Sequence, residues 1–185
     1  MSVIGTTKDE LRADVKSKLK KILADKEDFH RRQIELIEKI QSSPEFIKAK
    51  NILTYYPFDY EFDLSSLILA HPEKNWILPR PIGKSIMLLF QVENLDKLKT
   101  GRYGLKVPGS SSKFFKAEEL DLIIMPALAY DERGYRLGQG AGYYDRLLTK
   151  TSKSCKSFGV IHADLLLAKI PNEKHDKAVN KVLTV

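Results

Sequence analysis

The feature that most constrains this chain is a run of three glycines at alternate positions, Gly138, Gly140 and Gly142. Glycine has no Cβ atom and readily adopts positive φ, so successive N–H groups can turn toward one point and form an anion-binding concavity. Helical spacing of apolar residues begins at Tyr143, directly after the run. A glycine-rich loop that leads into a helix is suited to phosphate, because free N–H groups and the helix dipole point the same way.

Charged residues flank this loop on both sides. Arg136 offers a permanently charged, planar fork of donors, and Asp145 offers the kind of oxygen ligand that Mg²⁺ prefers. The glycine spacing matches neither the dinucleotide fingerprint G-x-G-x-x-G nor a Walker loop, since no Lys-Ser or Lys-Thr pair follows. By spacing alone, the run favours an ordinary surface turn over a phosphate site.

The longer run from Pro126 to Asp145 closely resembles the signature of the 5-formyltetrahydrofolate cyclo-ligases, also called methenyltetrahydrofolate synthetases. It contains PALAYD, then GYRLGQGAGYYD, with two residues between them. The resemblance implies an ATP-dependent cyclisation of 5-formyltetrahydrofolate to 5,10-methenyltetrahydrofolate, with release of ADP and phosphate. It also implies a three-layer α/β fold over nearly the whole chain.

The N-terminal segment carries a helix signal and two cations. Thr7 and Glu10 have the spacing of a capping box, and Lys8 and Arg12 project from one face of the helix that follows. Sequence physics alone favours two solvated charges. In the cyclo-ligase family a Lys and an Arg at this spacing contact ATP, so the resemblance implies that the first turns pack over residues 138–143.

Apolar runs alternate with helical patterns along the rest of the chain, which indicates an α/β architecture with a largely parallel central sheet. We expect further helices at about 28–41, 44–50, 63–69 and 143–150. We expect strands at 52–56, 76–81, 86–92, 120–125, 157–161 and 179–185. Without repeats, low-complexity segments or linkers, residues 1–185 are expected to form a single domain, with the helical segment 1–50 packing on it.

Three more specific expectations follow from these patterns. The second helix should turn Phe29, Ile34, Ile37 and Ile40 inward. The strand at 86–92 is apolar almost throughout, which predicts burial on both faces. Arg80 lies where the strand at 76–81 ends, and the strand ends of open α/β sheets bind ligands, so we expect Arg80 to face a ligand.

Two carboxylates gain a function only through the resemblance. Glu61 follows the strand at 52–56 and by composition is an exposed loop acid, but the family has a Glu there that binds the folate pterin. Asp176 by composition is a turn residue or a helix cap. The family's corresponding Asp, in a His-Asp or Asn-Asp pair, binds magnesium, and His175-Asp176 matches that pair.

The chain also departs from the family at two places. The segment Gly101 to Pro108 resembles the family's Gly-x-Phe-Gly-Ile-x-Glu-Pro, but Val107 replaces the Glu. Leu165 stands where the family carries a Gln before a proline. The contacts of that Glu and that Gln therefore do not transfer to this chain.

The resemblance assigns roles to a defined set of residues. Catalysis is assigned to Arg12, Arg136 and Asp145. Mg²⁺ binding is assigned to Asp145 and Asp176. ATP binding is assigned to Lys8, Arg12, Arg136, Leu137, Gly138, Gln139, Gly140, Ala141, Gly142, Tyr143 and Tyr144. Binding of 5-formyltetrahydrofolate is assigned to Tyr56, Glu61, Gln139, Gly140, Ala141, Gly142 and Tyr143.

Two alternatives to a cyclo-ligase remain open from the sequence. The net charge of +7 suits polyanionic small molecules but also a basic nucleic-acid-binding domain, although aromatic RNA-recognition motifs and zinc-finger spacings are absent. The replacements at Val107 and Leu165 keep open a catalytically inactive folate- or nucleotide-binding protein on the same fold. We expect ATP and a folate, possibly polyglutamylated, as partners, and no nucleic acid.

The remaining expectations concern location and chemistry. No apolar run approaches the length of a membrane span, and the first residues lack the apolar core of a signal peptide, so we expect a cytoplasmic protein. The sequence does not fix the oligomeric state, and we expect a monomer. The single cysteine, Cys155, excludes an internal disulfide. No neighbouring base activates this cysteine in sequence, so we expect a passive thiol.

Overall fold

The computed structural model describes residues 7–83, 85–101 and 104–185. The expectation about a signal peptide therefore falls mostly outside the described residues, and so do Arg102 and Tyr103 of the segment that ends at Pro108. In the described part, no helix is long and apolar enough to cross a membrane.

A seven-stranded sheet forms the centre of the molecule, in the order β12-β10-β7-β1-β2-β3-β6. The pairings from β12 to β2 are parallel, and β3 and β6 are added antiparallel. The expectation of a largely parallel sheet is confirmed. The strands are β1 (Asn51–Leu53), β2 (Asn75–Ile82), β3 (Ile86–Val92), β6 (Phe114–Phe115), β7 (Leu122–Pro126), β10 (Lys156–Ile161) and β12 (Lys181–Thr184).

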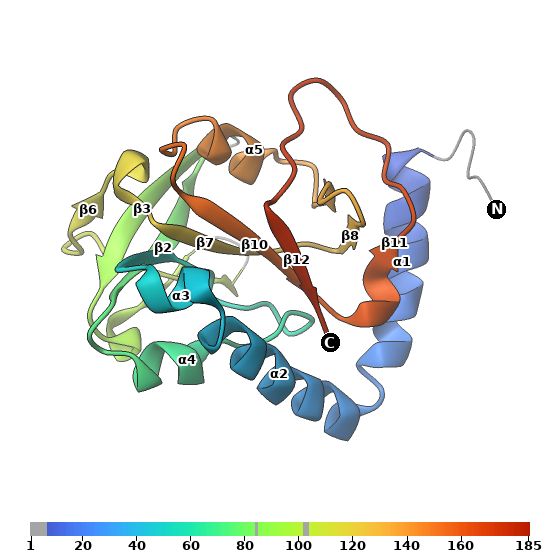
Figure 1. Ribbon diagram of the computed structural model, residues 1–185, viewed down its shortest axis with the longest axis horizontal. Coiled ribbons are helices and arrows are strands. Elements are labelled where there is room, and N and C mark those ends of the chain that lie inside the picture. Colours follow the sequence, from blue (N-terminus) through green and yellow to red (C-terminus); the bar gives the residue numbers. More distant parts are fainter. Residues whose placement is uncertain (1–6, 84, 102–103) are drawn as a thin grey trace.

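Helices cover both faces of this sheet. Figure 1 shows α2, α3 and α4 together on one side, with α5 opposite and α1 along one end. The helices are α1 (Lys8–Ile22), α2 (Lys26–Gln41), α3 (Pro44–Lys48), α4 (Ser65–Ala70) and α5 (Tyr143–Leu148). Short 3-10 turns occur at Leu95–Lys97, Ala117–Glu119 and Ala163–Leu165.

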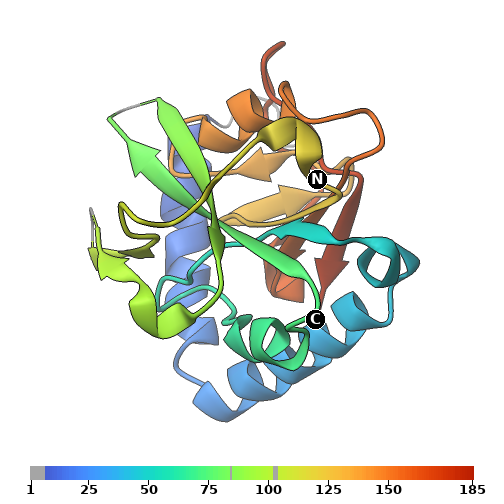
Figure 2. The same ribbon diagram turned by 90° about the vertical axis from the view of Figure 1, so that its left-hand side faces the viewer.

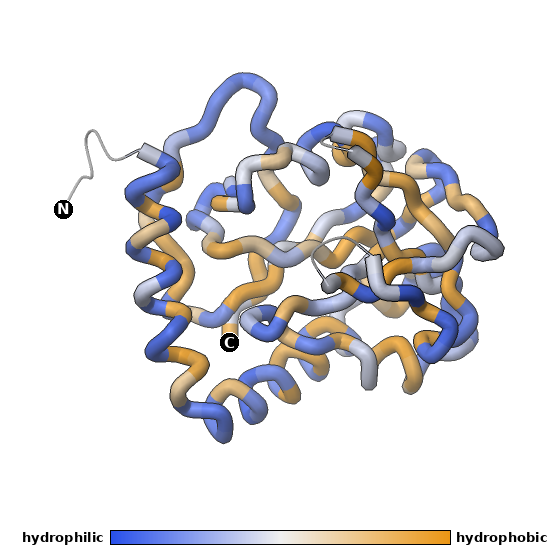
Figure 3. The backbone as a smooth tube through the Cα atoms, turned by 180° about the vertical axis from the view of Figure 1, so that it is seen from behind, coloured by the Kyte–Doolittle hydropathy of each residue, from blue (hydrophilic) through white to orange (hydrophobic). Residues whose placement is uncertain are grey.

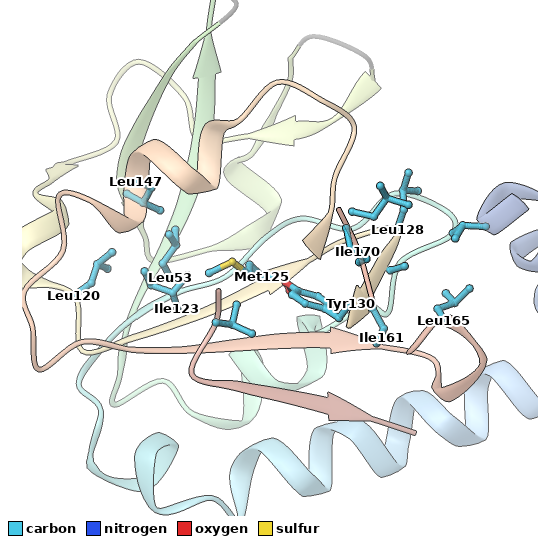
Figure 4. Packing of buried hydrophobic residues seen from close by; sticks show 14 of the residues in the cluster. Leu53, Leu120, Ile123, Met125, Leu128, Tyr130, Leu147, Ile161, Leu165 and Ile170 are labelled. Carbon is cyan, nitrogen blue, oxygen red and sulfur yellow. The ribbon is translucent and has the colours of Figure 1, made fainter. Parts of the chain in front are cut away.

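The core is divided in two because neighbouring residues of a strand point to opposite faces. In β1, Ile52 packs with the α2, α3 and α4 side, whereas Leu53 packs with α1 and α5. Leu122 and Ile123 of β7 divide in the same way. Figure 4 shows the second of these clusters, around Leu53, Ile123 and Tyr130. The sheet is therefore buried on both sides, as a three-layer fold requires.

The capping box predicted at the start of the first helix is present. Thr7 and Glu10 form the capping box of α1, and the Asp25 and Ser43 side chains cap α2 and α3. The expectation for Ile34 is wrong, because its side chain is 47% exposed and Leu36 is fully buried instead. Leu36 and Ile40 lie four residues apart on the inner face of α2, and Ile34 lies about 200° away from Leu36 around the helix.

The expectation that the strand at 86–92 is buried on both faces is also wrong. β3 pairs antiparallel with β2 over its whole length, and Ile86 at its start is 55% exposed. Figure 2 shows the two strands, in green, extending together beyond the rest of the sheet. Only the end of β3 nearer Phe90 is covered by the core, so an apolar run here reflects an extended hairpin rather than a central strand.

A second, three-stranded sheet leads into the glycine run. It has the order β11-β8-β9, formed by Leu166–Leu167, Ala129–Asp131 and Arg136–Leu137. A third sheet pairs β4 (Lys99–Thr100) with β5 (Lys106–Val107). Asp131 is fully buried and accepts hydrogen bonds from the amides of Arg133, Tyr135 and Ile170. These bonds fix the turn before the glycine run.

Tyr130 of β8 packs directly against Gly159 of β10. A substitution at Gly159 tests this contact. A Cβ atom at Gly159 would lie 2.4 Å from the Tyr130 ring. We expect Gly159→Ala to lower the free energy of unfolding by about 1–3 kcal/mol, as overpacking does. Gly109→Ala is the control, because a Cβ there meets only the Lys99 side chain at 3.7 Å. Equal denaturation midpoints for the two variants would contradict this packing.

Candidate active site

One cleft, with a volume of about 1090 Å³, opens at the carboxyl ends of the parallel strands. Ligand sites of open α/β sheets lie in this position. The volume is at the upper end of the range for small-molecule pockets, so the cleft has room for two ligands. Its walls come from the start of α1, the segment after β1, the β2–β3 hairpin, the glycine run and residues 173–176.

The glycine run, residues 138–142, forms one wall of the cleft as a loop between β9 and α5. Gly140 and Gly142 have φ of +96° and +63°, a conformation that L side chains rarely adopt. Gly142 is also the residue immediately before α5. Two of the three glycines are therefore required by backbone conformation, and the run is more than an ordinary surface turn.

The first turns of α1 lie against this loop. The Arg12 Nε atom donates a hydrogen bond to the Gly138 carbonyl, at 2.9 Å, and its guanidinium lies 3.5 Å from where a Gly140 Cβ would be. Val15 and Leu19 anchor the helix in the core. Figure 3 shows α1 at the edge of the molecule, beside the hydrophilic segment that precedes β12. The expected packing of the helix start on the loop is present, while its role toward ATP stays a prediction.

The two predicted metal ligands lie close to the same loop, and each is paired with a cation. Asp145 Oδ1 lies 2.6 Å from Arg136 Nη2 and accepts the Lys177 amide at 2.9 Å. Asp176 Oδ2 lies 2.6 Å from Lys8 Nζ. Burial alone would raise the pKa of Asp176, but hydrogen bonds from Lys8 and the Glu173 amide outweigh it and lower this pKa.

These two carboxylates fit a metal only in part. Within the described residues, no group of three or more His, Cys, Asp or Glu side chains could hold an ion. Mg²⁺ is commonly held by one or two carboxylates, with phosphate oxygens and water completing its octahedron. Asp145 and Asp176 suit this arrangement, which needs a phosphate ligand in the cleft.

Glu61 lies inside the cleft and is not an exposed loop acid. Burial raises the pKa of its carboxyl to about 7, although the hydrogen bond from the Phe58 amide to Oε2 lowers it in part. Phe58 and Tyr60 stack beside it, with ring centroids 5.4 Å apart. The Gln139 amide donates to the Tyr60 hydroxyl at 3.0 Å. The segment after β1 therefore contacts the glycine loop, and Tyr56 lines the same cleft.

Arg80 is not in the cleft, so the expectation that it faces a ligand is wrong. Its neighbours Pro79 and Pro81 line the cleft, and strand alternation sends Arg80 to the opposite face. There its guanidinium lies 4.0 Å from the centroid of the Phe90 ring and donates to the Pro108 carbonyl. The end of this strand does line the cleft, but the alternation of side chains decides which of its residues face the cleft.

The two positions that depart from the family differ in location. Val107 is buried and lines the cleft. Leu165 is buried beside a separate small cavity of about 20 Å³ that also borders Glu61. Both replacements put apolar side chains into packed surroundings, so neither leaves an unpaired charge.

Arg146 contacts the glycine loop but was not predicted from the sequence. Arg146 of α5 donates to the Ala141 carbonyl of the glycine loop at 2.5 Å and to the Ser85 carbonyl of the β2–β3 hairpin at 2.8 Å. Its only sequence signal is its place three residues after Tyr143, on the same face of a helix. The hairpin contact could not be found from the sequence, because it joins segments 61 residues apart.

Two curated proteins resemble this chain over most of its length. A probable 5-formyltetrahydrofolate cyclo-ligase of Schizosaccharomyces pombe is 35% identical over 77% of this chain and 72% of its own length. A probable cyclo-ligase of Caenorhabditis elegans is 30% identical over 99% of this chain and 95% of its own.

Solved structures give the same result. The methenyltetrahydrofolate synthetase of Aquifex aeolicus superposes with a TM-score of 0.83 at 33% identity, covering 96% of this chain and 89% of that one. The enzyme of Mycoplasma pneumoniae shares the fold, with a TM-score of 0.75 at 18% identity over 96% of this chain and 98% of that one. The sequence profile of the family matches residues 4–185, and the chain therefore belongs to the 5-formyltetrahydrofolate cyclo-ligase family.

Proposed function

We propose that this protein converts 5-formyltetrahydrofolate to 5,10-methenyltetrahydrofolate, with ATP as co-substrate and release of ADP and phosphate. The observation that carries the proposal is the meeting of Arg12, the glycine loop and Glu61 in one cleft. Membership of the family favours this enzyme over both alternatives, an inactive folate- or nucleotide-binding protein and a nucleic-acid-binding domain.

The chemistry explains why the site needs these residue types. A formamide oxygen is a poor leaving group, and its phosphorylation by ATP makes a good one. The neighbouring N10 then attacks the activated carbon, phosphate leaves, and a cyclic amidinium remains. The protein must position two ligands and stabilise charge on the transferring phosphoryl group. No protein nucleophile is needed, and Cys155 could not serve as one, because burial raises the pKa of its thiol to about 12.

Lys8, Arg12 and Arg136 are the cations proposed to bind the triphosphate, together with the amides of residues 137–144. Arg136 is the most enclosed of the three, since its side chain is 7% exposed. Its Nη1 donates to the Lys177 carbonyl, which holds the guanidinium beside Asp145. Asp145 and Asp176 would hold Mg²⁺ on the phosphates, where the ion would neutralise charge. Catalytic roles are proposed for Arg12, Arg136 and Asp145.

The folate is proposed to occupy the side of the cleft formed by Tyr56, Glu61 and the glycine-loop residues from Gln139 to Tyr143. An ionised Glu61 can accept two hydrogen bonds from the pterin amide and amino groups, a geometry that a carboxylate suits. A basic protein, with a net charge of +7, also suits a folate with an anionic, polyglutamylated tail. We further propose a cytoplasmic monomer in which residues 1–185 act as one domain.

The first prediction is the activity itself. Purified protein mixed with ATP, Mg²⁺ and 5-formyltetrahydrofolate should form the methenyl product, followed by its near-ultraviolet absorbance. Omission of ATP, or of the metal by chelation, should abolish product formation. Folate binding without turnover under complete conditions would instead favour the inactive alternative.

The second prediction concerns the α1 cations. Arg12→Ala should lower turnover by at least about a hundred-fold, the scale of arginines that act on transferring phosphoryl groups. Lys8→Ala should mainly raise the KM for ATP. Lys16→Ala is the control, because Lys16 is exposed on the same helix and should contribute less than about 1 kcal/mol. Steady-state kinetics with ATP varied at saturating folate measure all three, and wild-type kinetics for Arg12→Ala would refute the assignment.

The third prediction concerns Glu61 and pH. Its carboxyl has a pKa of about 7, and only the ionised form accepts both pterin hydrogen bonds. Folate affinity should therefore be nearly maximal at pH 8 and fall by about tenfold per pH unit well below the pKa. Glu61→Gln should remove this pH dependence and weaken folate binding by about 1.5–3 kcal/mol, roughly ten- to a hundred-fold.

Calorimetric titration of folate between pH 5.5 and 8.5 measures the effect. Asp59→Asn is the matched control, because Asp59 lies in the same segment but is exposed. It should leave both affinity and pH dependence unchanged. A pH dependence that survives in Glu61→Gln would show that another group titrates.

A further inference from the structure

The β2–β3 hairpin contributes an apolar wall to the cleft, and Arg146 links its tip to the glycine loop. Pro79, Pro81 and Met87 line this wall, and none of them offers a charged group to a ligand. Such a surface suits the aromatic part of a ligand rather than its phosphates. The hairpin extends beyond the body of the sheet (Figure 2), so the width of the cleft depends on what holds the hairpin in place.

Two side chains of α5 contact the hairpin near its tip. The Tyr143 hydroxyl donates to the Gly83 carbonyl at 2.9 Å, and Arg146 Nε donates to the Ser85 carbonyl at 2.8 Å. Tyr143 and Arg146 lie three residues apart on one face of the helix, and the Arg146 guanidinium lies 5.6 Å from the Tyr143 ring centroid. The same guanidinium donates through Nη2 to Ala141 in the glycine loop.

We propose that Arg146 is a positioning residue, a role that rests on the proposed function. Its hydrogen bonds hold the hairpin against the glycine loop and so set the width of the folate-binding part of the cleft. Both acceptors are uncharged carbonyls, one in the hairpin and one in the glycine loop. Its contact to Ala141 also places its Nη1 atom 2.9 Å from where a Gly142 Cβ would lie, so the loop leaves room for this side chain.

The geometry requires a guanidinium and not merely a positive charge. Arginine presents several N–H donors in one rigid plane, so one side chain can bond two carbonyls in fixed directions. A lysine ammonium at the same position keeps the charge but is a compact point charge on a flexible stem. Arg146→Lys therefore separates positioning from simple electrostatic attraction of an anionic substrate.

The test compares Arg146→Met and Arg146→Lys with Lys150→Met. Lys150 is an exposed cation just after α5, so its loss controls for charge. In both Arg146 variants we expect the KM for 5-formyltetrahydrofolate to rise by at least about tenfold, which corresponds to about 1.4 kcal/mol. We expect kcat to change by less than about threefold and Lys150→Met to behave as wild type.

Hydrogen exchange of ligand-free protein gives a readout that does not depend on activity. Peptides that cover residues 85–92 and 136–142 should exchange faster in both Arg146 variants than in wild type or Lys150→Met. Unchanged exchange rates would show that Arg146 does not hold the hairpin against the glycine loop. A wild-type folate KM in Arg146→Lys would overturn the positioning role. Loss of thermal stability with an unchanged KM would reduce Arg146 to a structural residue. An inactive wild type would contradict the proposed function. The exchange data would still test whether Arg146 holds the hairpin against the glycine loop.

Discussion

The packing of α1 against the core is the interaction on which the site depends. Val15 and Leu19 bury the inner face of this helix, and the Arg12–Gly138 hydrogen bond joins residues 126 positions apart. Burial of two apolar side chains stabilises the helix position by a few kcal/mol, more than an exposed ion pair contributes. The cations at the start of the chain therefore reach the glycine loop because the core holds their helix there, and not because charges attract.

Charge compensation is the second property of the site. Lys8 pairs with Asp176 and Arg136 pairs with Asp145, so two of the three cations proposed to bind phosphate each contact a proposed metal ligand. Arg136 is largely buried and its Nη2 atom makes no well-aligned hydrogen bond. Unpaired buried charge is costly, and these pairs keep the cations in place near the loop. Binding of a metal nucleotide would exchange these partners for phosphate and metal without adding net buried charge from the protein.

Much of the fold could be predicted from the sequence, because caps and apolar periodicity act locally. The capping box at Thr7 and the alternation of strands and helices along the chain are of this kind. Ile34 and Arg80 show the limit, since both lie beside the correct residue but on the wrong face. Glu61 could be placed after β1, but its burial depends on Phe58 and on packing distant in sequence. Arg146 acts through carbonyls of another segment, which no sequence pattern records.

The most direct test of the account is an experimental structure of the protein with ADP, Mg²⁺ and the methenyl product. The account predicts the β-phosphate within hydrogen-bond distance of Arg12 and of amides in residues 138–143. It also predicts the pterin against Glu61 and the metal between Asp145 and Asp176. A nucleotide bound outside this cleft, or a pterin that makes no contact with Glu61, would contradict the account.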